Sequence, residues 1–198
     1  MKTKALTHRE ERILLLLKSF DYLTRDQLNN YFKLGTIRNT NRILKELSDY
    51  LASFRDGYQS VYYLNKNGRE YVESSKVRKK SNQIEHYLMR NEFWLFCNCP
   101  TDWKNEVKIS NGKVSIVADA MYSVGGLQHF LEVDNKQTMK ENRAKIKRYK
   151  DLMNSIALKV GHFPVIVWLT TTQLRRKQLE DACKDLPQFR VYLINEIK

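Results

Sequence analysis

Three acidic residues in the second half of the chain have the chemical type and the spacing to bind a divalent cation. Asp119 lies late in one apolar segment, and Glu132 and Asp134 lie two residues apart at the end of the next. In a β-strand, residues two apart project from the same face, so these last two carboxylates are expected to point the same way. Gly125 and Gly126 separate the two segments. A turn there would make the strands neighbours and bring Asp119 close to Glu132.

Carboxylates that gather in one place repel one another unless a cation neutralises them. Oxygen ligands suit Mg²⁺ or Mn²⁺, and such an ion can activate water and stabilise a phosphodiester during cleavage. The predicted metal ligands are Asp119, Glu132, Asp134 and, on the preceding segment, Glu106. A structural alternative stays open, in which Glu132 is an ordinary strand-end acid and Asp134 caps the next helix.

A strongly basic helix is predicted directly after these acids, from about residue 138 to 157. Its start and middle hold one acid, Glu141, before Asp151. The basic residues around them are Lys136, Lys140, Arg143, Lys145, Lys147, Arg148 and Lys150. A solvated helix usually mixes both signs of charge. This one is therefore predicted to lie along a phosphate backbone, with Lys140, Arg143 and Lys147 as contacts.

The elements that must position these residues can be predicted from patterning and turn residues. A helix over about 82–97 precedes three strands, at about 103–109, 113–122 and 128–134. After the basic helix come a continuous apolar strand over 163–171, typical of a strand buried on both faces, a helix capped by Thr172, and a strand over 189–194. The order predicts an α/β domain with a mixed sheet over residues 81–198.

The first half of the chain is predicted to form three helices and a hairpin. Capping boxes begin at Thr7 and Thr24, where a hydroxyl and a carboxylate or amide three residues on satisfy reciprocal backbone N–H groups. A third helix is predicted over about 36–51. Asp56-Gly57 lies between two β-prone segments, which is a strong hairpin signal. This layout, over residues 1–80, is typical of a winged helix-turn-helix.

In a winged helix, the second helix of the turn enters the major groove of DNA and the hairpin contacts the backbone. Arg38, Asn41 and Arg42 share one face of the third predicted helix, and arginine and asparagine read guanine and adenine edges. Lys45, Arg55 and Tyr58 suit phosphate contacts. Two alternatives stay open for this half: a merely solvated helix face, and a protein-interaction module.

Composition supports a polyanionic partner. The 35 basic and 22 acidic residues give a net charge of +13, which favours nucleic acid. The longest apolar runs are far shorter than the ~20 residues of a membrane span, so no membrane association is expected. Three cysteines form no disulfide framework, and a cytoplasmic location is predicted. Scattered histidines, and the absence of a Gly-x-Ser-x-Gly elbow or a phosphate-cradling loop, argue against other catalytic classes.

These segments together carry a resemblance. Val-Ala-Asp119-Ala-Met-Tyr, followed by Phe-Leu-Glu132-Val-Asp134-Asn-Lys-Gln-Thr and a lysine-rich helix, resembles the replication-relaxation family of plasmids and mobile elements. In that family, too, a winged helix precedes the block. The block is similar in turn to the PD-(D/E)xK nuclease fold and to the MOB-C class of plasmid relaxases. The resemblance implies an α+β protein, with a winged helix followed by a restriction-endonuclease-like domain.

The resemblance also implies roles for individual residues. Asp119 and Glu132 match the two metal-binding acids, while Asp134 stands where many such nucleases have the lysine that orients water. Lys136 could supply that positive charge, which makes Asp119, Glu132, Asp134 and Lys136 the predicted catalytic set.

Two functions follow from these residues. One is a metal-dependent nickase that binds double-stranded origin DNA in replication or mobilisation. The other is a non-catalytic DNA-binding accessory or regulatory protein on an inactivated nuclease scaffold. A homodimer and a replication or mobilisation partner protein both stay open.

Overall fold

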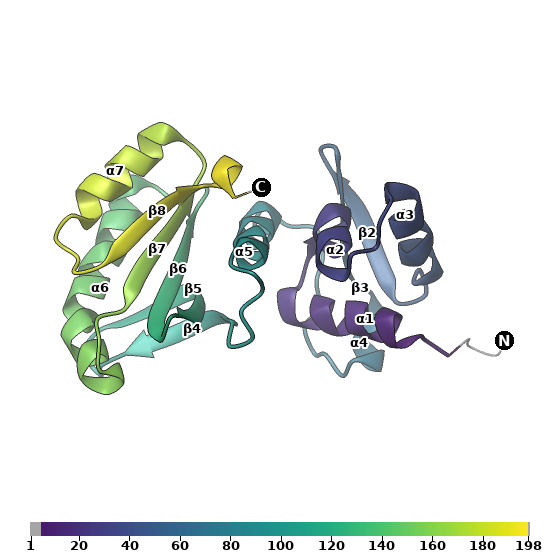
Figure 1. Ribbon diagram of the computed structural model, residues 1–198, viewed down its shortest axis with the longest axis horizontal. Helices are drawn as coiled ribbons and strands as arrows, with labels where there is room; N and C mark the ends of the chain where they lie inside the picture. Colours follow the sequence, from purple (N-terminus) through teal and green to yellow (C-terminus); the bar gives the residue numbers. More distant parts are fainter. Residues whose placement is uncertain (1–4, 198) are drawn as a thin grey trace. The chain divides into compact units, whose positions relative to one another are not determined.

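The computed structural model describes residues 5–197, and the chain divides into two compact units, Met1–Asn91 and Glu92–Lys198 (Figure 1). The division lies inside one helix, α5 (Ile84–Phe96), eleven residues beyond the predicted boundary. Residues of the predicted linker contact the first unit. Arg78 forms an ion pair with Asp21 at 2.9 Å, and the Tyr22 hydroxyl donates to the Lys79 carbonyl. The basic segment is therefore held by the first unit.

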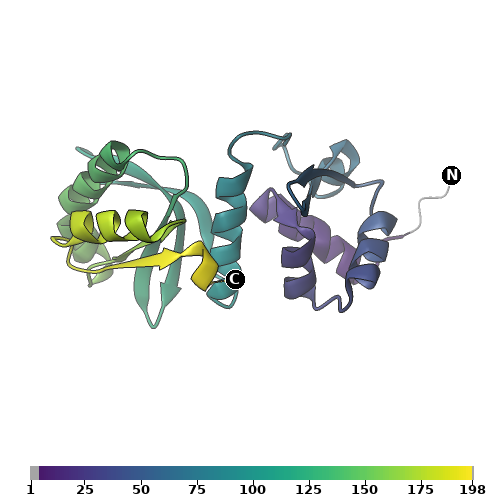
Figure 2. The same ribbon diagram turned by 90° about the horizontal axis from the view of Figure 1, so that it is seen from above.

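The first unit contains four helices and a small sheet before α5. In chain order its elements are α1 (His8–Phe20), β1 (Leu23–Thr24), α2 (Arg25–Phe32), α3 (Ile37–Glu46), β2 (Leu51–Asp56), β3 (Gln59–Leu64) and α4 (Lys66–Tyr71). The strands pair antiparallel in the order β1-β3-β2. Helices α1, α2 and α3 gather beside this sheet (Figure 2).

Local sequence signals account for most of these elements. Thr7 and Thr24 form the two predicted capping boxes, at the starts of α1 and α2. The third helix, however, ends at Glu46 and not near residue 51. The reason is that Leu51 already pairs with Leu64 at the start of the hairpin, so the buried leucine that extended the helical pattern belongs to the sheet.

The second unit is a five-stranded mixed sheet covered by helices. Its elements after α5 are β4 (Lys104–Ser110), β5 (Ser115–Val124), β6 (Leu127–Asp134), α6 (Met139–Val160), β7 (Val165–Thr170), α7 (Gln173–Cys183), β8 (Phe189–Leu193) and a short 3-10 turn (Ile194–Glu196). The strand order is β4-β5-β6-β7-β8. Pairing is antiparallel from β4 to β6 and parallel from β6 to β8. The predicted order of elements is confirmed.

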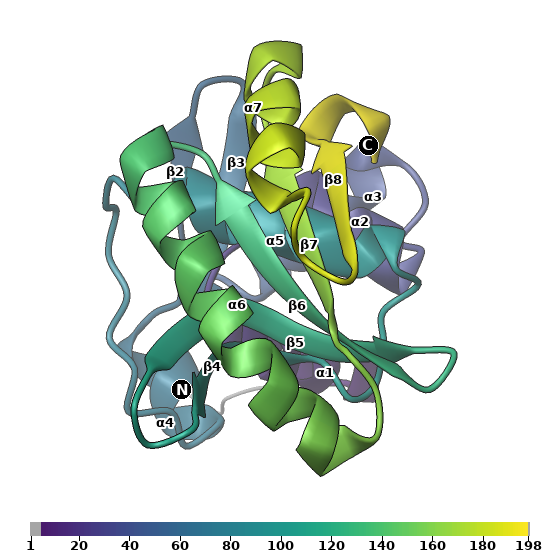
Figure 3. The ribbon, with the colours of Figure 1, turned by 90° about the vertical axis from the view of Figure 1, so that its left-hand side faces the viewer.

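Helices α6 and α7 cover one face of this sheet (Figure 3). One apolar core joins them to the strands, with Phe130, Trp168 and Val191 from the sheet packed against Tyr149 of α6 and Leu179 of α7. The other face is covered in part by the last turn of α5, where Phe93 contacts Tyr122 and Tyr192. Each face of β6 and β7 is therefore buried, as expected for central strands.

Strand β5 is irregular at Asp119. Ala118 lies in the core beneath α6 together with Phe130, whereas Ala120 pairs with Leu131, which projects from the opposite face of β6. Residues two apart share a face only in a regular strand, so the alternation breaks between these alanines. The opposing residue of β4, Glu106, has a left-handed backbone with φ 53°. The register between β4 and β5 is the same on both sides of this point, with Asn105 opposite Ala120 and Val107 opposite Ala118, so the irregularity inserts no extra residue into either strand.

No helix within residues 5–197 is long and apolar enough to cross a membrane.

Candidate functional site

The structure brings Asp119 and Glu132 together, as their spacing predicted. The Asp119 carboxylate accepts a hydrogen bond from the backbone N–H of Val133 at 2.7 Å, which anchors it to β6 beside Glu132. Glu132 is 1% exposed. Burial and the nearby charge of Asp119 raise the pKa of Glu132 to about 8. A buried carboxyl group, Glu132, thus lies beside a half-buried one, Asp119.

The cation beside these acids is Lys145 of α6. Its ammonium forms an ion pair with one oxygen of Glu132, and the hydroxyl of Tyr149 donates to the other at 2.6 Å. Burial opposes the charge of Lys145, but Glu132 and Asp119 outweigh it and raise the pKa of that ammonium above its ordinary value. Burial and Glu132 likewise raise the pKa of the Tyr149 hydroxyl.

Lys145 is the site residue that the sequence analysis placed only among the general basic residues of the helix. The spacing of the buried residues in α6 contains a signal for the role of Lys145. Asn142, Ile146 and Tyr149 are buried at helical intervals, and they mark the face of α6 that packs on the sheet. Lys145 lies at the margin of this face. A lysine there must either reach solvent or find a buried acid.

Asp134 lies in a separate network. Arg175 of α7 donates to both of its oxygens, at 2.9 and 2.5 Å, while Asn142 and Thr170 donate at 2.7 and 2.8 Å. Burial raises the pKa of Asp134, but these hydrogen bonds outweigh burial and hold it below the ordinary value. Arg175 also donates to the Gln137 carbonyl. Asp134 therefore joins the ends of β6, β7, α6 and α7, which is a structural role.

The two other predicted members lie elsewhere. Lys136 is exposed in the turn between β6 and α6, and Glu106 is exposed on the edge strand β4. Across residues 5–197, no three acidic, histidine or cysteine side chains are grouped so that they could hold a metal ion. The predicted four-residue Mg²⁺ or Mn²⁺ ligand set is therefore not assembled in this structure. Glu132 already uses both oxygens for Lys145 and Tyr149, so these side chains as placed do not fit such an ion.

A second candidate site lies on the first unit. The predicted residues Arg38, Asn41, Arg42 and Lys45 are all exposed on α3. Arg42 donates to Glu46 at 2.6 Å and to Asn39 at 2.9 Å. A hollow of about 260 Å³ separates α3 from the hairpin, with Asn41 and Lys45 among the lining residues. The helix and the hairpin thus form two walls of one hollow.

The predicted hairpin contacts lie at its exposed end. Tyr58 is 99% exposed in the turn between β2 and β3. Arg55 donates to the Ser60 hydroxyl across the two strands at 2.9 Å. On the second unit, the predicted contacts Lys140, Arg143 and Lys147 are exposed along α6.

A model of the replication-relaxation family matches residues 14–166. This range runs from α1 to β7 and so includes α3, Asp119, Glu132 and Lys145. The chain belongs to the replication-relaxation family. No curated protein matches the chain.

Two solved structures are similar to this replication-relaxation protein at low identity. One is protein VC1899 from Vibrio cholerae, with 14% identity and a TM-score of 0.44 over 98% of this chain and 55% of that one. The other is Can2 from Sulfobacillus thermosulfidooxidans in complex with cyclic tetra-adenylate, with 13% identity, a TM-score of 0.34, and coverage of 94% and 52%. The chain spans about half the length of each.

Proposed function

We propose that this replication-relaxation family protein binds double-stranded DNA at the origin of a plasmid or mobile element, and acts there in replication or DNA relaxation. The observation that carries the proposal is the exposed face of α3 beside the β2–β3 hairpin. The element order α1-β1-α2-α3-β2-β3 and the strand order β1-β3-β2 agree with a winged helix. In that fold, α3 enters the major groove and the hairpin contacts the backbone.

The side chains on this surface have complementary tasks. Arg38 and Asn41 present the donor and acceptor groups that discriminate base edges. Lys45, Arg55 and the exposed hydroxyl of Tyr58 supply contacts to phosphate, which position the protein without reading sequence. Arg42 is held by Glu46 in the free protein. It must exchange that partner for DNA, so we expect it to contribute less than Arg38.

We expect Arg38→Ala and Asn41→Ala each to weaken binding to cognate origin DNA about 10- to 100-fold, with little effect on scrambled DNA. Fluorescence anisotropy with labelled duplexes from the protein's own genetic neighbourhood measures both affinities. Arg9→Ala, at an exposed position on α1, is the matched control and should bind as the wild type does. Unchanged cognate affinity in both α3 variants would refute base reading by this helix.

For the second unit, we propose a binding role in preference to cleavage. Lys145 forms an ion pair with Glu132, and Arg175 forms an ion pair with Asp134. A carboxylate that is already paired has little left with which to bind a cation. The nicking hypothesis is favoured only by the closeness of Asp119 and Glu132, which agrees with a PD-(D/E)xK scaffold.

A supercoiled plasmid that carries the origin should therefore be retarded in a gel but stay uncut. We expect this result with Mg²⁺, with Mn²⁺ and with chelator, and equally for Asp119→Asn. Conversion to open circles that requires a metal ion and disappears in Asp119→Asn would instead establish a nuclease.

A further inference from the structure

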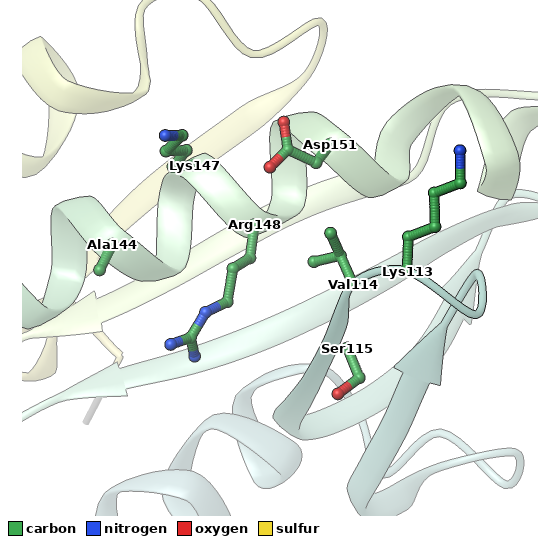
Figure 4. Close-up of a pocket in the computed structure, with 7 residues that line it drawn as sticks. All are labelled: Lys113, Val114, Ser115, Ala144, Lys147, Arg148 and Asp151. Carbon is green, nitrogen blue, oxygen red and sulfur yellow. The ribbon is translucent and has the colours of Figure 1, made fainter.

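The second unit contains an open pocket between the β4–β5 turn and α6. Its volume is about 610 Å³. Lys113 and Ser115 line it from the strand side, while Lys147, Arg148 and Asp151 line it from α6 (Figure 4). Arg148 extends from the helix toward the strand that carries Ser115.

The charge of the lining is positive. Three cations and one anion give 3 − 1 = +2, and all four of these side chains belong to exposed residues. Two other lysines of α6 have acidic partners, since Lys145 pairs with Glu132 and Lys150 with Asp185. The pocket thus gathers three cations against a single carboxylate, which favours an anionic ligand.

The two walls of the pocket are tied together before any ligand binds. The Asn111 amide donates to the Asp151 carbonyl at 3.4 Å and to the Ser155 hydroxyl at 3.3 Å. Its side-chain oxygen accepts from the backbone N–H groups of Lys113 and Val114. One side chain therefore shapes the turn and fastens it to α6, so Lys113 is held opposite the helix.

The side chains that line the pocket are of the types that bind a phosphodiester. Lysine and arginine bind phosphate through charge-assisted hydrogen bonds, and the Ser115 hydroxyl adds a neutral donor. Among residues 5–197, no aromatic side chain lines the pocket on which a base could stack, so we expect contact with the DNA backbone and not with bases. Its openness to solvent suits a continuous strand that passes through.

We propose that this pocket holds the phosphate backbone of DNA through Lys113, Lys147 and Arg148, so that the second unit is a DNA-binding module in its own right. The inference rests on the proposed function, because the ligand is the DNA that α3 binds. Two modules on one chain raise the overall affinity, since binding of the first makes binding of the second intramolecular. The exposed Lys140 and Arg143 on the same helix would extend the contact along the strand.

Arg148 of the pocket also lies three positions after Lys145 on α6, about one helical turn away. The charge of Arg148 acts on Lys145, whose ammonium contacts Glu132. A phosphate beside Arg148 would therefore lie close to the part of the molecule that resembles a nuclease centre.

The test is the salt dependence of DNA binding by the full chain. Each lost phosphate contact lowers the slope of log affinity against log salt by about 0.9. For the triple variant Lys113→Gln, Lys147→Gln, Arg148→Gln, the plot of log affinity against log salt should be less steep by about two to three. This variant should also bind DNA about 10- to 100-fold more weakly at ~0.1 M salt. A control triple, Lys104→Gln, Lys177→Gln, Lys184→Gln, removes the same charge at exposed positions outside the pocket.

Two single variants separate the pocket from general charge. Asp151→Asn should tighten binding several-fold, because it removes the carboxylate among the described lining residues. Loss of folding cannot produce that gain. Asn111→Ala should weaken binding without a change of net charge, because the turn loses its attachment to α6.

Equal effects of the pocket triple and the control triple would overturn this inference while leaving the proposed function intact. The reverse result, loss in the pocket triple with no effect of Arg38→Ala or Asn41→Ala, would support the pocket and refute base reading by α3. Absence of DNA binding by the wild type would refute both. Displacement of DNA by free nucleotide would overturn the assignment of a backbone ligand.

Discussion

Replacement of Arg175 by methionine is expected to lower the free energy of unfolding of the second unit by about 3 kcal/mol at pH 7. The physical reason is the buried carboxylate that the change leaves behind. Asp134 is 1% exposed and receives two hydrogen bonds from the guanidinium. Asn142 and Thr170 would still donate to it, but they carry no charge. Methionine keeps most of the apolar stem of arginine.

Urea denaturation followed by tryptophan fluorescence measures this loss. All three tryptophans, Trp94, Trp103 and Trp168, lie in the second unit, so the signal reports that unit. Arg176→Met is the matched control. Arg176 forms ion pairs with Glu180 and Glu196, both at the surface, and such pairs contribute less than about 1 kcal/mol each. Similar losses in the two variants would show that Asp134 is not stabilised by Arg175.

The effect of Arg175 should also depend on pH in a definite direction. The pKa of Asp134 is held below its ordinary value of 3.8, so the folded state favours the ionised form. This contribution is fully present above the unfolded-state pKa and is lost as the pH falls through the lower folded-state pKa. The difference between wild type and Arg175→Met should therefore narrow below about pH 4.

Replacement of Lys145 by methionine is expected to cost about 2 kcal/mol at pH 9 and less than about 1 kcal/mol at pH 5. At the higher pH, Glu132 is ionised in the wild type and Lys145 is its cation. At the lower pH, Glu132 holds a proton, because its pKa is raised to about 8 by burial and by Asp119. Removal of the lysine then leaves a neutral Glu132 and not a buried carboxylate without its cation.

The sign follows from linkage. Between the ordinary Glu pKa of 4.5 and the folded value of about 8, the folded state binds more protons than the unfolded state. Stability therefore falls as the pH rises through this window. The charge of Lys145 lowers the pKa of Glu132 and so narrows the pH range over which stability is lost. In Lys145→Met the pKa of Glu132 should be higher, and the free energy of unfolding should continue to fall to higher pH.

A double-mutant cycle isolates this pair. Glu132→Gln should remove the pH-dependent part of the Lys145→Met effect, because no carboxylate is left to titrate. Lys147→Met is the control. Lys147 is exposed and follows the buried Ile146, so its replacement should leave the free energy of unfolding unchanged at both pH values. A Lys145→Met effect that is the same at pH 5 and pH 9 would contradict the assignment of Lys145 as the partner of ionised Glu132.

The elements of this protein follow from local sequence. Capping boxes at Thr7 and Thr24 begin helices where predicted. The hairpin predicted at Asp56-Gly57 is present, with Gly57 and Tyr58 as the turn between the paired Asp56 and Gln59. These signals involve residues three or four positions apart, so no knowledge of the fold is needed to interpret them. The spacing around Gly125 and Gly126 likewise indicated that Asp119 and Glu132 lie on neighbouring strands. Long-range pairing, in contrast, decided that Leu51 begins a strand and that α3 ends early.

The chemistry of the acids was decided by tertiary structure. A regular strand was the natural assumption for β5, but its alternation breaks at Asp119 opposite the left-handed Glu106. Lys145 meets Glu132 from 13 positions away, and Arg175 meets Asp134 from 41. Such partners depend on how α6 and α7 pack on the sheet, because burial selects which of many basic side chains an acid meets. The sequence by itself determined that Asp119 and Glu132 come together. Packing of α6 and α7 on the sheet determined that Asp134 lies in a separate network and that Lys145 and Arg175 are the cations that pair with Glu132 and Asp134.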